Sequence, residues 1–248
     1  LPQAKEISPY RYVGVNFNSQ GNPNLKPSDN YNLDLKWDFN PTPTELISLT
    51  AFYKLIKNPI SRIEVASAGG YLSYENIADK ATVAGVEVEI RKNLFVRPVS
   101  NAAHGMNKLS LGLNGSYIYT NAKMPLATVT TGSQLEGAAP WIVNFDLSHN
   151  FTKGERSFVN TLVLNYVSDK IYTIGTQGYQ DVMEQGVLIL DFVSQAKLNK
   201  HLSLNLKARN LLNPSYKLSR KANENGEKVI LNDYKKGINI SLGVSCTF

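Results

Sequence analysis

Apolar and polar residues alternate with a period of two along most of the chain. The segment Tyr31–Phe39 is the clearest case, because its odd positions are apolar and its even positions are polar or charged. Successive side chains of a β-strand point to opposite faces, so the apolar residues of this segment share one face. The same pattern predicts nine strands, at residues 31–39, 47–55, 86–91, 109–120, 141–148, 158–166, 188–198, 202–209 and 238–248.

The lengths of these segments and of their connections favour a membrane barrel. Most segments run to about ten residues, which suits a strand tilted across a bilayer, whereas strands of globular proteins average about 5–6 residues. The connections alternate between short turns and long loops, as in outer-membrane barrels. The predicted long loops are 57–75, 121–138, 168–185 and 213–235. Residues 92–107 break this rule, and we interpret them as a long insertion on the side of the short turns.

Aromatic residues gather at the ends of the predicted strands, for example Trp37, Tyr117, Trp141, Tyr166 and Phe248. Such rings rest at the two interfaces of a membrane, so they predict aromatic girdles. The alternative is the core of a soluble β-sandwich. A sandwich does not need aromatics at strand ends, so this placement favours a barrel. On this register Cys246 is a small lipid-facing residue.

Composition excludes several classes of protein. The formal net charge is +6, but the basic residues are spread along the chain among acidic ones, which disfavours nucleic-acid binding. No stretch approaches the roughly 18 apolar residues of a transmembrane helix. The single cysteine and the dispersed His104, His149 and His201 predict neither a disulfide nor a metal site. No nucleophile elbow or phosphate-binding loop is present, so we expect no enzyme activity and no cofactor.

Nine strands alone would leave an open sheet. Both edges would carry unpaired backbone groups, for which lipid offers no partner. The chain also starts at Leu1 without a recognisable signal peptide. We therefore expect it to be part of a longer protein whose other strands complete the barrel.

Five stretches resemble the C-terminal barrel of TonB-dependent receptors of the kind abundant in Bacteroidota. Together they span nearly the whole chain in the expected order. They are Gly21–Pro27 with Asn30–Leu35, Leu49–Lys54 with Lys57–Ile60, Tyr74–Asn76 with Ala81 and Gly85–Glu89, Ala208–Asn213, and the terminal Phe248.

The resemblance implies the last nine strands of a 22-stranded antiparallel transmembrane β-barrel whose lumen is blocked by an N-terminal plug. We expect residues 1–248 to form one barrel portion that does not include the plug domain. With the C-terminus in the periplasm, residues 1–27 would be an extracellular loop. Residues 28–248 would hold membrane strands, long outer loops and mostly short periplasmic turns.

The resemblance further implies a receptor of the bacterial outer membrane that imports a scarce nutrient. Its partners would be a TonB-type energy-transducing complex, its own plug and missing strands, membrane lipid and lipopolysaccharide, and a surface lipoprotein. Relatives carry siderophores, cobalamin, glycans or peptides, and these residues do not choose among them. Two other functions stay open: a passive porin or structural barrel, and a soluble β-sandwich binding module.

Candidate site residues follow from this topology. Six tyrosines of the outer loops would stack on a ligand or, equally, pack one loop on another: Tyr10, Tyr12, Tyr71, Tyr74, Tyr172 and Tyr179. Glu87, Glu89 and Arg91 would face the lumen, either contacting the plug or simply filling a polar lumen. The basic stretch 215–236 would attract an anionic ligand or lipopolysaccharide phosphates, or be a solvated loop.

Overall fold

The computed structural model describes residues 1–14, 17–65, 67, 70–99, 105–124, 133–176, 178–222 and 227–247. Nearly all regular structure in them is β, and the helix α1 (Ala4–Ile7) is a single turn. The prediction of an all-β fold is therefore confirmed. Among the described residues, no helix is both long enough and apolar enough to cross a lipid bilayer.

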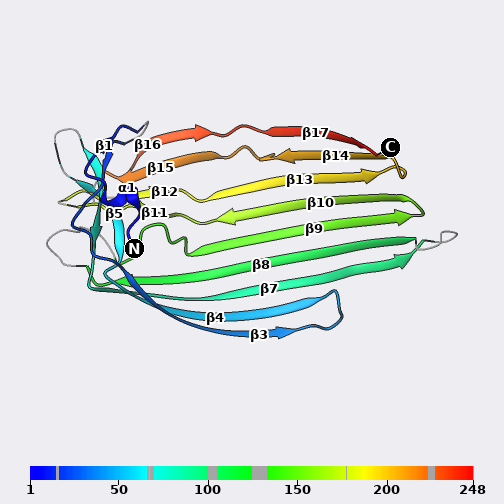
Figure 1. Ribbon diagram of the computed structural model, residues 1–248, viewed down its shortest axis with the longest axis horizontal. Coiled ribbons are helices and arrows are strands. Elements are labelled where there is room, and N and C mark those ends of the chain that lie inside the picture. The colour runs from blue at the N-terminus through cyan, green and yellow to red at the C-terminus, as the bar shows by residue number, and fades with distance from the viewer. Residues whose placement is uncertain are drawn as a thin grey trace.

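One antiparallel sheet of nine strands forms the body of the molecule (Figure 1). Its strand order is β17-β14-β13-β10-β9-β8-β7-β4-β3. Each of the nine predicted segments overlaps one of these strands, although Leu198, Ile238 and Thr247 lie just outside their strands and Phe248 falls outside the described residues. The strands are β3 (Asp29–Phe39), β4 (Leu46–Lys57), β7 (Lys80–Pro98), β8 (Met106–Ala122), β9 (Trp141–Lys153), β10 (Arg156–Val167), β13 (Val187–Lys197), β14 (Leu202–Arg209) and β17 (Asn239–Cys246).

The connections of this sheet divide between its two ends (Figure 1). All four long connections leave from one end, here named the loop end, as the sequence predicts. These are residues 58–79, 123–140, 168–186 and 210–238. Shorter connections lie at the opposite end, named the turn end.

Residues 92–107 are not the long insertion that we expected at the turn end. Strand β7 continues to Pro98, and β8 begins at Met106. A β-bulge between Asn93 and Phe95 leaves Leu94 without a partner in the ladder. A bulge shifts the alternation by one residue. This shift concealed the end of β7 from a search for strict period two.

The pairing register joins the apolar residues of the nine strands into one continuous face. Leu49 pairs with both Trp37 and Val88, and the same matching continues to Leu206 and Leu242. No described segment covers this face, so Leu242 is 73% exposed. In a membrane protein, lipid acyl chains cover such a surface.

Aromatic residues border this apolar face at both ends. At the loop end Tyr117 pairs with Trp141, and their ring centroids are 4.7 Å apart. At the turn end Trp37 stacks with Phe39 at 6.1 Å. Tyr31 and Trp37 stand at opposite ends of the same strand, which separates the two borders by about 20 Å at about 3.4 Å per residue. Aromatic residues at both borders of the apolar face are the arrangement of the two girdles of an outer-membrane barrel.

Two small four-stranded sheets lie at the loop end, together with residues 1–27. We name these residues and the four long connections the cap. Most of their strands are too short for period two to reveal them in the sequence, and the longest one, at Lys228–Lys235, does not alternate strictly. One sheet joins β1 (Arg11–Tyr12), β2 (Ser19–Gln20), β6 (Tyr71–Asn76) and β5 (Ile60–Val65); the other joins β11 (Lys170–Thr173), β12 (Val182–Glu184), β15 (Ser215–Lys221) and β16 (Lys228–Lys235).

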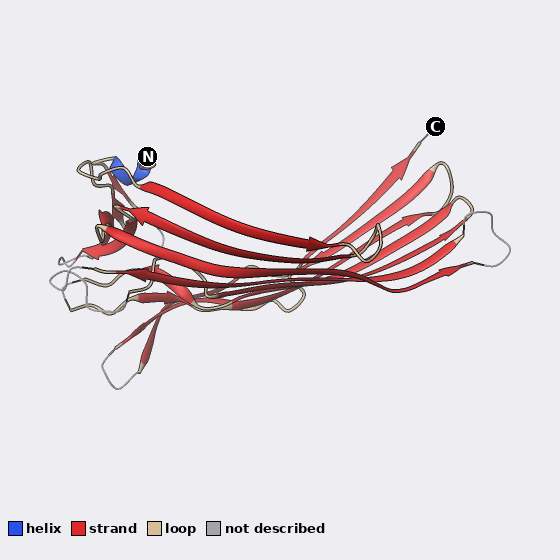
Figure 2. Ribbon diagram, turned by 90° about the horizontal axis from the view of Figure 1, so that it is seen from below, coloured by secondary structure: helices blue, strands red, loops and turns tan. Residues whose placement is uncertain are grey.

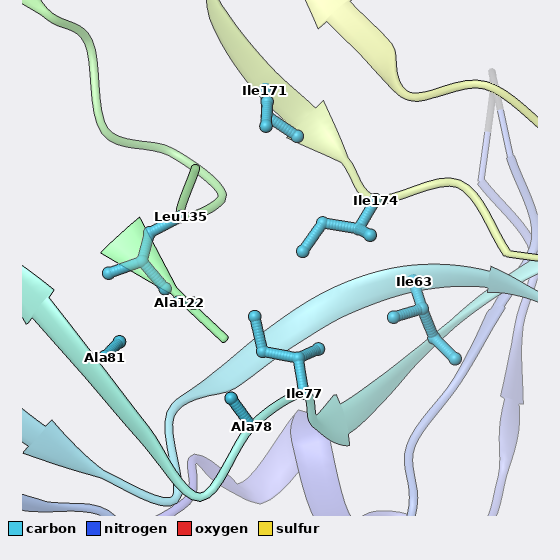
Figure 3. Close-up of a cluster of buried hydrophobic side chains, with 8 residues drawn as sticks. All are labelled: Ile63, Ile77, Ala78, Ala81, Ala122, Leu135, Ile171 and Ile174. Atoms are coloured by element: carbon cyan, nitrogen blue, oxygen red, sulfur yellow. The ribbon is translucent and has the colours of Figure 1, made fainter. Parts of the chain in front are cut away.

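The main buried hydrophobic cluster lies at the cap and the adjoining strand ends (Figure 3). It joins segments far apart in the chain, because the side chains come from the connections that follow β4, β8 and β10. A single-layer sheet has no second layer to bury residues against, so the core forms where the loops meet. The cluster contains Ile63, Ile77, Ala78, Ala81, Ala122, Leu135, Ile171 and Ile174.

The main sheet is curved and twisted (Figure 2), and it does not close on itself within the described residues. Strand β3 pairs only with β4, and β17 only with β14. Both edge strands are exposed along their whole length. The open edges agree with the expectation that further strands complete the barrel.

Candidate functional site

An ion pair between Arg62 and Glu136 holds three segments of the cap together. The Arg62 Nη2 lies 2.8 Å from a Glu136 carboxylate oxygen, and both side chains are less than a quarter exposed. The same guanidinium donates two hydrogen bonds to the Tyr172 carbonyl, at 2.6 and 3.0 Å, and lies 4.0 Å from the centre of the Tyr172 ring. One side chain of β5 therefore fixes β11 and residues 133–140.

A second ion pair, between Arg220 of β15 and Glu64 of β5, connects the two small sheets. Its side chains are 16% and 13% exposed, so this pair is the more buried of the two. Burial lowers the pKa of the Arg220 guanidinium from its usual value, and the adjacent Glu64 carboxylate compensates for the cost of burying the charge. The Thr176 hydroxyl donates to the Glu64 carbonyl and reinforces this junction.

Three of the predicted ligand-binding tyrosines, Tyr10, Tyr12 and Tyr71, lie in or beside the small sheet that contains β1 and β6. Tyr10 is 75% exposed and Tyr12 is 46% exposed, so both present rings to solvent. Tyr71 is more covered, because Arg11 lies over its ring at 5.5 Å. Only Tyr10 and Tyr12 of these three present largely open rings.

Tyr74 and Tyr172 are the more covered of the other three predicted tyrosines, whereas Tyr179 is 43% exposed, close to the value for Tyr12. Burial raises the pKa of the Tyr74 hydroxyl, with nearby Arg62 acting in the opposite direction. Tyr172 stacks under Arg62, and its ring centre lies 6.1 Å from that of Phe17. Tyr179 lies beneath Arg220, whose guanidinium is 5.3 Å from the ring centre. The structure thus brings Tyr74 and Tyr172 near one cation and Tyr179 near another.

The sequence interpretation missed a stacked pair of tyrosines in β15 and β16. Tyr216 and Tyr234 are cross-strand partners with ring centroids 5.4 Å apart and an interplanar angle of 19°. The Lys236 Nζ lies 3.8 Å from the centre of the Tyr216 ring. The charge of residues 215–236 does not predict this pair. A search for aromatic residues in this stretch finds Tyr216 and Tyr234 but not their pairing, which depends on the register of β15 and β16.

The basic charge of residues 215–236 is partly neutralised by ion pairs. Lys217 pairs with Asp233 at 3.6 Å, and Arg220 pairs with Glu64. Lys221, Lys228 and other lysines of this stretch remain exposed.

Glu87, Glu89 and Arg91 lie on the polar face of the main sheet, opposite the apolar face. Glu87 pairs with Thr50 and Ser116, residues of the same polar face. The Arg91 Nε donates to a Glu89 carboxylate oxygen at 2.7 Å.

A polar cavity of about 430 Å³ lies on that face, toward the turn end. Glu89 and Arg91 line it, together with Asn114, Asn144 and Asp146. The cavity therefore offers both charges and amide groups to whatever occupies the space beside the sheet.

The described residues contain no group of three or more His, Cys, Asp or Glu side chains arranged to hold a metal ion. The candidate site is thus a set of aromatic, ionic and amide groups at the loop end, with a second polar region on one face of the sheet.

Comparison with known families identifies the chain. Residues 1–211 match the family model described as TonB dependent receptor-like, beta-barrel. The chain belongs to the TonB-dependent receptor β-barrel family. It is accordingly an outer-membrane protein that crosses the bilayer with many strands, of the receptor and transporter kind. No curated protein matches the chain.

The stretches that resemble TonB-dependent receptors have structural roles in this chain. The Asn76 side chain accepts a hydrogen bond from the Lys26 amide at 2.8 Å and donates to the carbonyls of Lys26 and Asn58, at 3.0 and 2.9 Å. Asn58 itself has a φ of 47°, a left-handed conformation that asparagine tolerates. Asn76 therefore fixes the start of β3 to the end of β4.

Proposed function

We propose that this chain is the ligand-capturing barrel portion of a TonB-dependent importer. The observation that carries the proposal is the sheet itself, which has one continuous apolar face and one polar face and bears a packed cap at a single end. Such a sheet, completed to a barrel, separates lipid from a polar lumen. Family membership adds the receptor kind and, for the family in general, a plug and an energy-coupling partner.

The proposed orientation places the loop end and residues 1–27 outside the cell, and the turn end in the periplasm. The asymmetry of connection lengths supports this assignment, since outer-membrane barrels carry their long loops outside. A nutrient would then meet the cap first. The proposed capture residues are the six cap tyrosines, Tyr10, Tyr12, Tyr71, Tyr74, Tyr172 and Tyr179.

Glu87, Glu89 and Arg91 are proposed to contact the plug across the polar face. The support is their position in and beside a polar cavity that also presents Asp146. Arg91 is 68% exposed at its side chain, so it has room to form a further ion pair. The exposed lysines of β15 and β16 are proposed to meet lipopolysaccharide phosphates at the outer surface.

The decisive experiment measures binding and uptake separately in cells that carry the full-length receptor. A labelled nutrient that supports growth only when the receptor is present would be followed with and without a protonophore. Energy-coupled import predicts that the protonophore abolishes accumulation and leaves surface binding intact. Uptake that continues unchanged without the proton gradient would instead establish a passive porin.

A further inference from the structure

Four polar residues lie within the apolar face of the main sheet, near its turn end. They form one row across the adjacent strands β8, β9, β10 and β13 (Figure 1). His149 and Asn160 are direct cross-strand partners, and so are Asn160 and Ser194. Asn107 completes the row, because its side-chain oxygen lies 2.8 Å from the His149 Nε2. We name Asn107, His149, Asn160 and Ser194 the polar row.

The polar row lies inside the border of the apolar face. On β9 that face begins with Trp141 at the loop end and reaches Phe151 at the turn end. His149 precedes Phe151 by two residues, and a step of two residues returns a strand to the same face. Phe151 pairs with Phe158 of β10, and their ring centroids are 6.4 Å apart. These two rings form the turn-end aromatic border on β9 and β10, so the polar row is on the side of the border that meets lipid acyl chains.

Hydrogen bonds within the polar row leave amide donors for a ligand. The Ser194 hydroxyl donates to the Asn160 side-chain oxygen at 2.7 Å, and the His149 Nε2 donates to the Asn107 side-chain oxygen. Both amide oxygens are thus occupied, and no described residue accepts a hydrogen bond from either side-chain NH2 group. An unsatisfied donor is costly among lipid tails, which offer no acceptor. The polar row therefore suits a ligand that brings acceptor oxygens.

Two cations follow the aromatic border on the same face, toward the turn end. Lys153 and Arg156 are cross-strand partners, and each lies two residues beyond an aromatic residue of that border. Both are exposed, and within the described part of the chain neither forms an ion pair. Glu155, which lies between them in the sequence, is paired with Lys200 at 3.2 Å. Long basic side chains at the edge of a bilayer attract lipid phosphates.

We propose that the polar row and the two cations bind one anionic glycerophospholipid. Its phosphate lies against Lys153 and Arg156, and its ester carbonyls accept hydrogen bonds from the side-chain NH2 groups of Asn107 and Asn160. A zwitterionic lipid carries an ammonium that the two cations repel, so an anionic headgroup is favoured. The inference rests on the orientation proposed above, because glycerophospholipids form the periplasmic leaflet of the outer membrane, where that orientation places the turn end.

The test uses the full-length receptor, delipidated in detergent, and native mass spectrometry to measure the affinity of the first bound lipid. Dioleoylphosphatidylglycerol is expected to bind more tightly than dioleoylphosphatidylethanolamine. Arg156→Gln removes one cation and should weaken the binding of phosphatidylglycerol about fivefold. Asn160→Leu removes the amide donor and should weaken it by a similar factor, about fivefold. Because this variant places an apolar side chain on the apolar face, the barrel should still fold.

The matched controls carry the same kinds of substitution on the polar face of the sheet. Lys207→Gln removes a cation and Asn205→Leu removes an amide from β14, at positions that alternate with Leu206 of the apolar face. Neither position faces lipid, so both variants should bind phosphatidylglycerol within about twofold of the wild type.

The proposal fails on any of three results. They are binding of phosphatidylethanolamine as tight as that of phosphatidylglycerol, a loss below about twofold in Arg156→Gln or Asn160→Leu, and tighter binding of lipid A than of phosphatidylglycerol. If the same two variants lost lipid A, the orientation proposed above would be reversed as well. Lipid binding to the purified receptor requires no energy source, so it is independent of import. Uptake that persists with a protonophore would refute energy-coupled import and leave the lipid site standing.

Discussion

The ring of Phe52 lies over Gly85 on the polar face of the main sheet, in the space that a Cβ at position 85 would occupy. The two residues are cross-strand partners in β4 and β7. The same Cβ would also meet the Tyr117 carbonyl oxygen of β8. Gly85 thus permits three adjacent strands to approach closely, and its absent side chain is replaced by an aromatic ring from the neighbouring strand.

Gly85→Ala is therefore expected to destabilise the barrel by about 1–3 kcal/mol, the usual cost of overpacking. The ring could rotate away, but the Tyr117 carbonyl belongs to the backbone and cannot yield cheaply. Thermal unfolding of the full-length receptor in detergent, followed by circular dichroism, measures the change. Gly115→Ala in β8 is the matched control, because its Cβ would meet nothing within 4 Å. Equal melting temperatures for the two variants would contradict the packing argument.

Arg62→Ala is expected to loosen the cap. The variant loses the Glu136 pair, two hydrogen bonds to the Tyr172 carbonyl and the contact with the Tyr172 ring, and it leaves a partly buried carboxylate unpaired. A cost of about 2–3 kcal/mol in local stability follows, somewhat below that of breaking a fully buried pair. Hydrogen exchange of the amides in β11 and residues 133–140 measures it.

The control for Arg62→Ala is Lys200→Ala at the turn end. Lys200 and Glu155 lie 3.2 Å apart, but their side chains are 70% and 55% exposed. Exposed pairs contribute about 0–1 kcal/mol, so amide exchange nearby should barely change. Similar exchange effects for the two variants would show that the Arg62 contacts do not hold the cap together.

The membrane strands could be predicted from the sequence, because one face meets lipid and the other a polar space. That condition requires alternation over the whole strand, and Tyr31–Phe39 obeys it without exception. At Leu94 one unpaired residue reverses the phase of the alternation, and this hid the end of β7. Consecutive strands run in opposite directions, so alternate connections lie at the same end of the sheet. This rule places the four long loops together at one end.

The arrangement of the cap could not be predicted in the same way. Its strands are short, and its stability comes from contacts between residues distant in sequence, such as Arg220 with Glu64. No local pattern reports which loop meets which. The tyrosines of the loops were therefore identified as a set, while the pairing of Tyr216 with Tyr234 required the register of β15 and β16.

The stability of the cap should fall in alkaline solution because of Tyr74. Burial raises the pKa of its hydroxyl above the ordinary value of 10.0. In the folded cap the neutral form is retained at a pH where the unfolded chain would ionise. This contribution is complete below about pH 10 and is lost as the pH rises through the higher pKa of the folded state. Hydrogen exchange of β6 between pH 8 and pH 11, corrected for the intrinsic rate, measures the loss.

Tyr74→Phe has no ionisable hydroxyl at this position and should lose less cap stability over that range. Tyr10→Phe, at a residue that is 75% exposed, controls for general effects of removing a hydroxyl, and it should follow the wild type. An alkaline loss in Tyr74→Phe as large as that in the wild type would assign the effect to another group.

Asn76→Ala should release the N-terminal segment from the cap. The Asn76 side chain makes three hydrogen bonds, two to Lys26 and one to Asn58. Losing them costs about 1–3 kcal/mol; of the three backbone partners, the Asn58 carbonyl still accepts a hydrogen bond from the Ser28 hydroxyl. Limited proteolysis of the full-length receptor should therefore cut residues 1–27 faster in this variant. Asn40→Ala, which removes one hydrogen bond to Glu45 at the turn end, is the matched control and should leave the cutting rate unchanged. If the protease cuts Asn76→Ala at the wild-type rate, other contacts suffice to hold the segment. One such contact is the hydrogen bond from the Asn22 side chain to the Tyr74 carbonyl, at 3.0 Å.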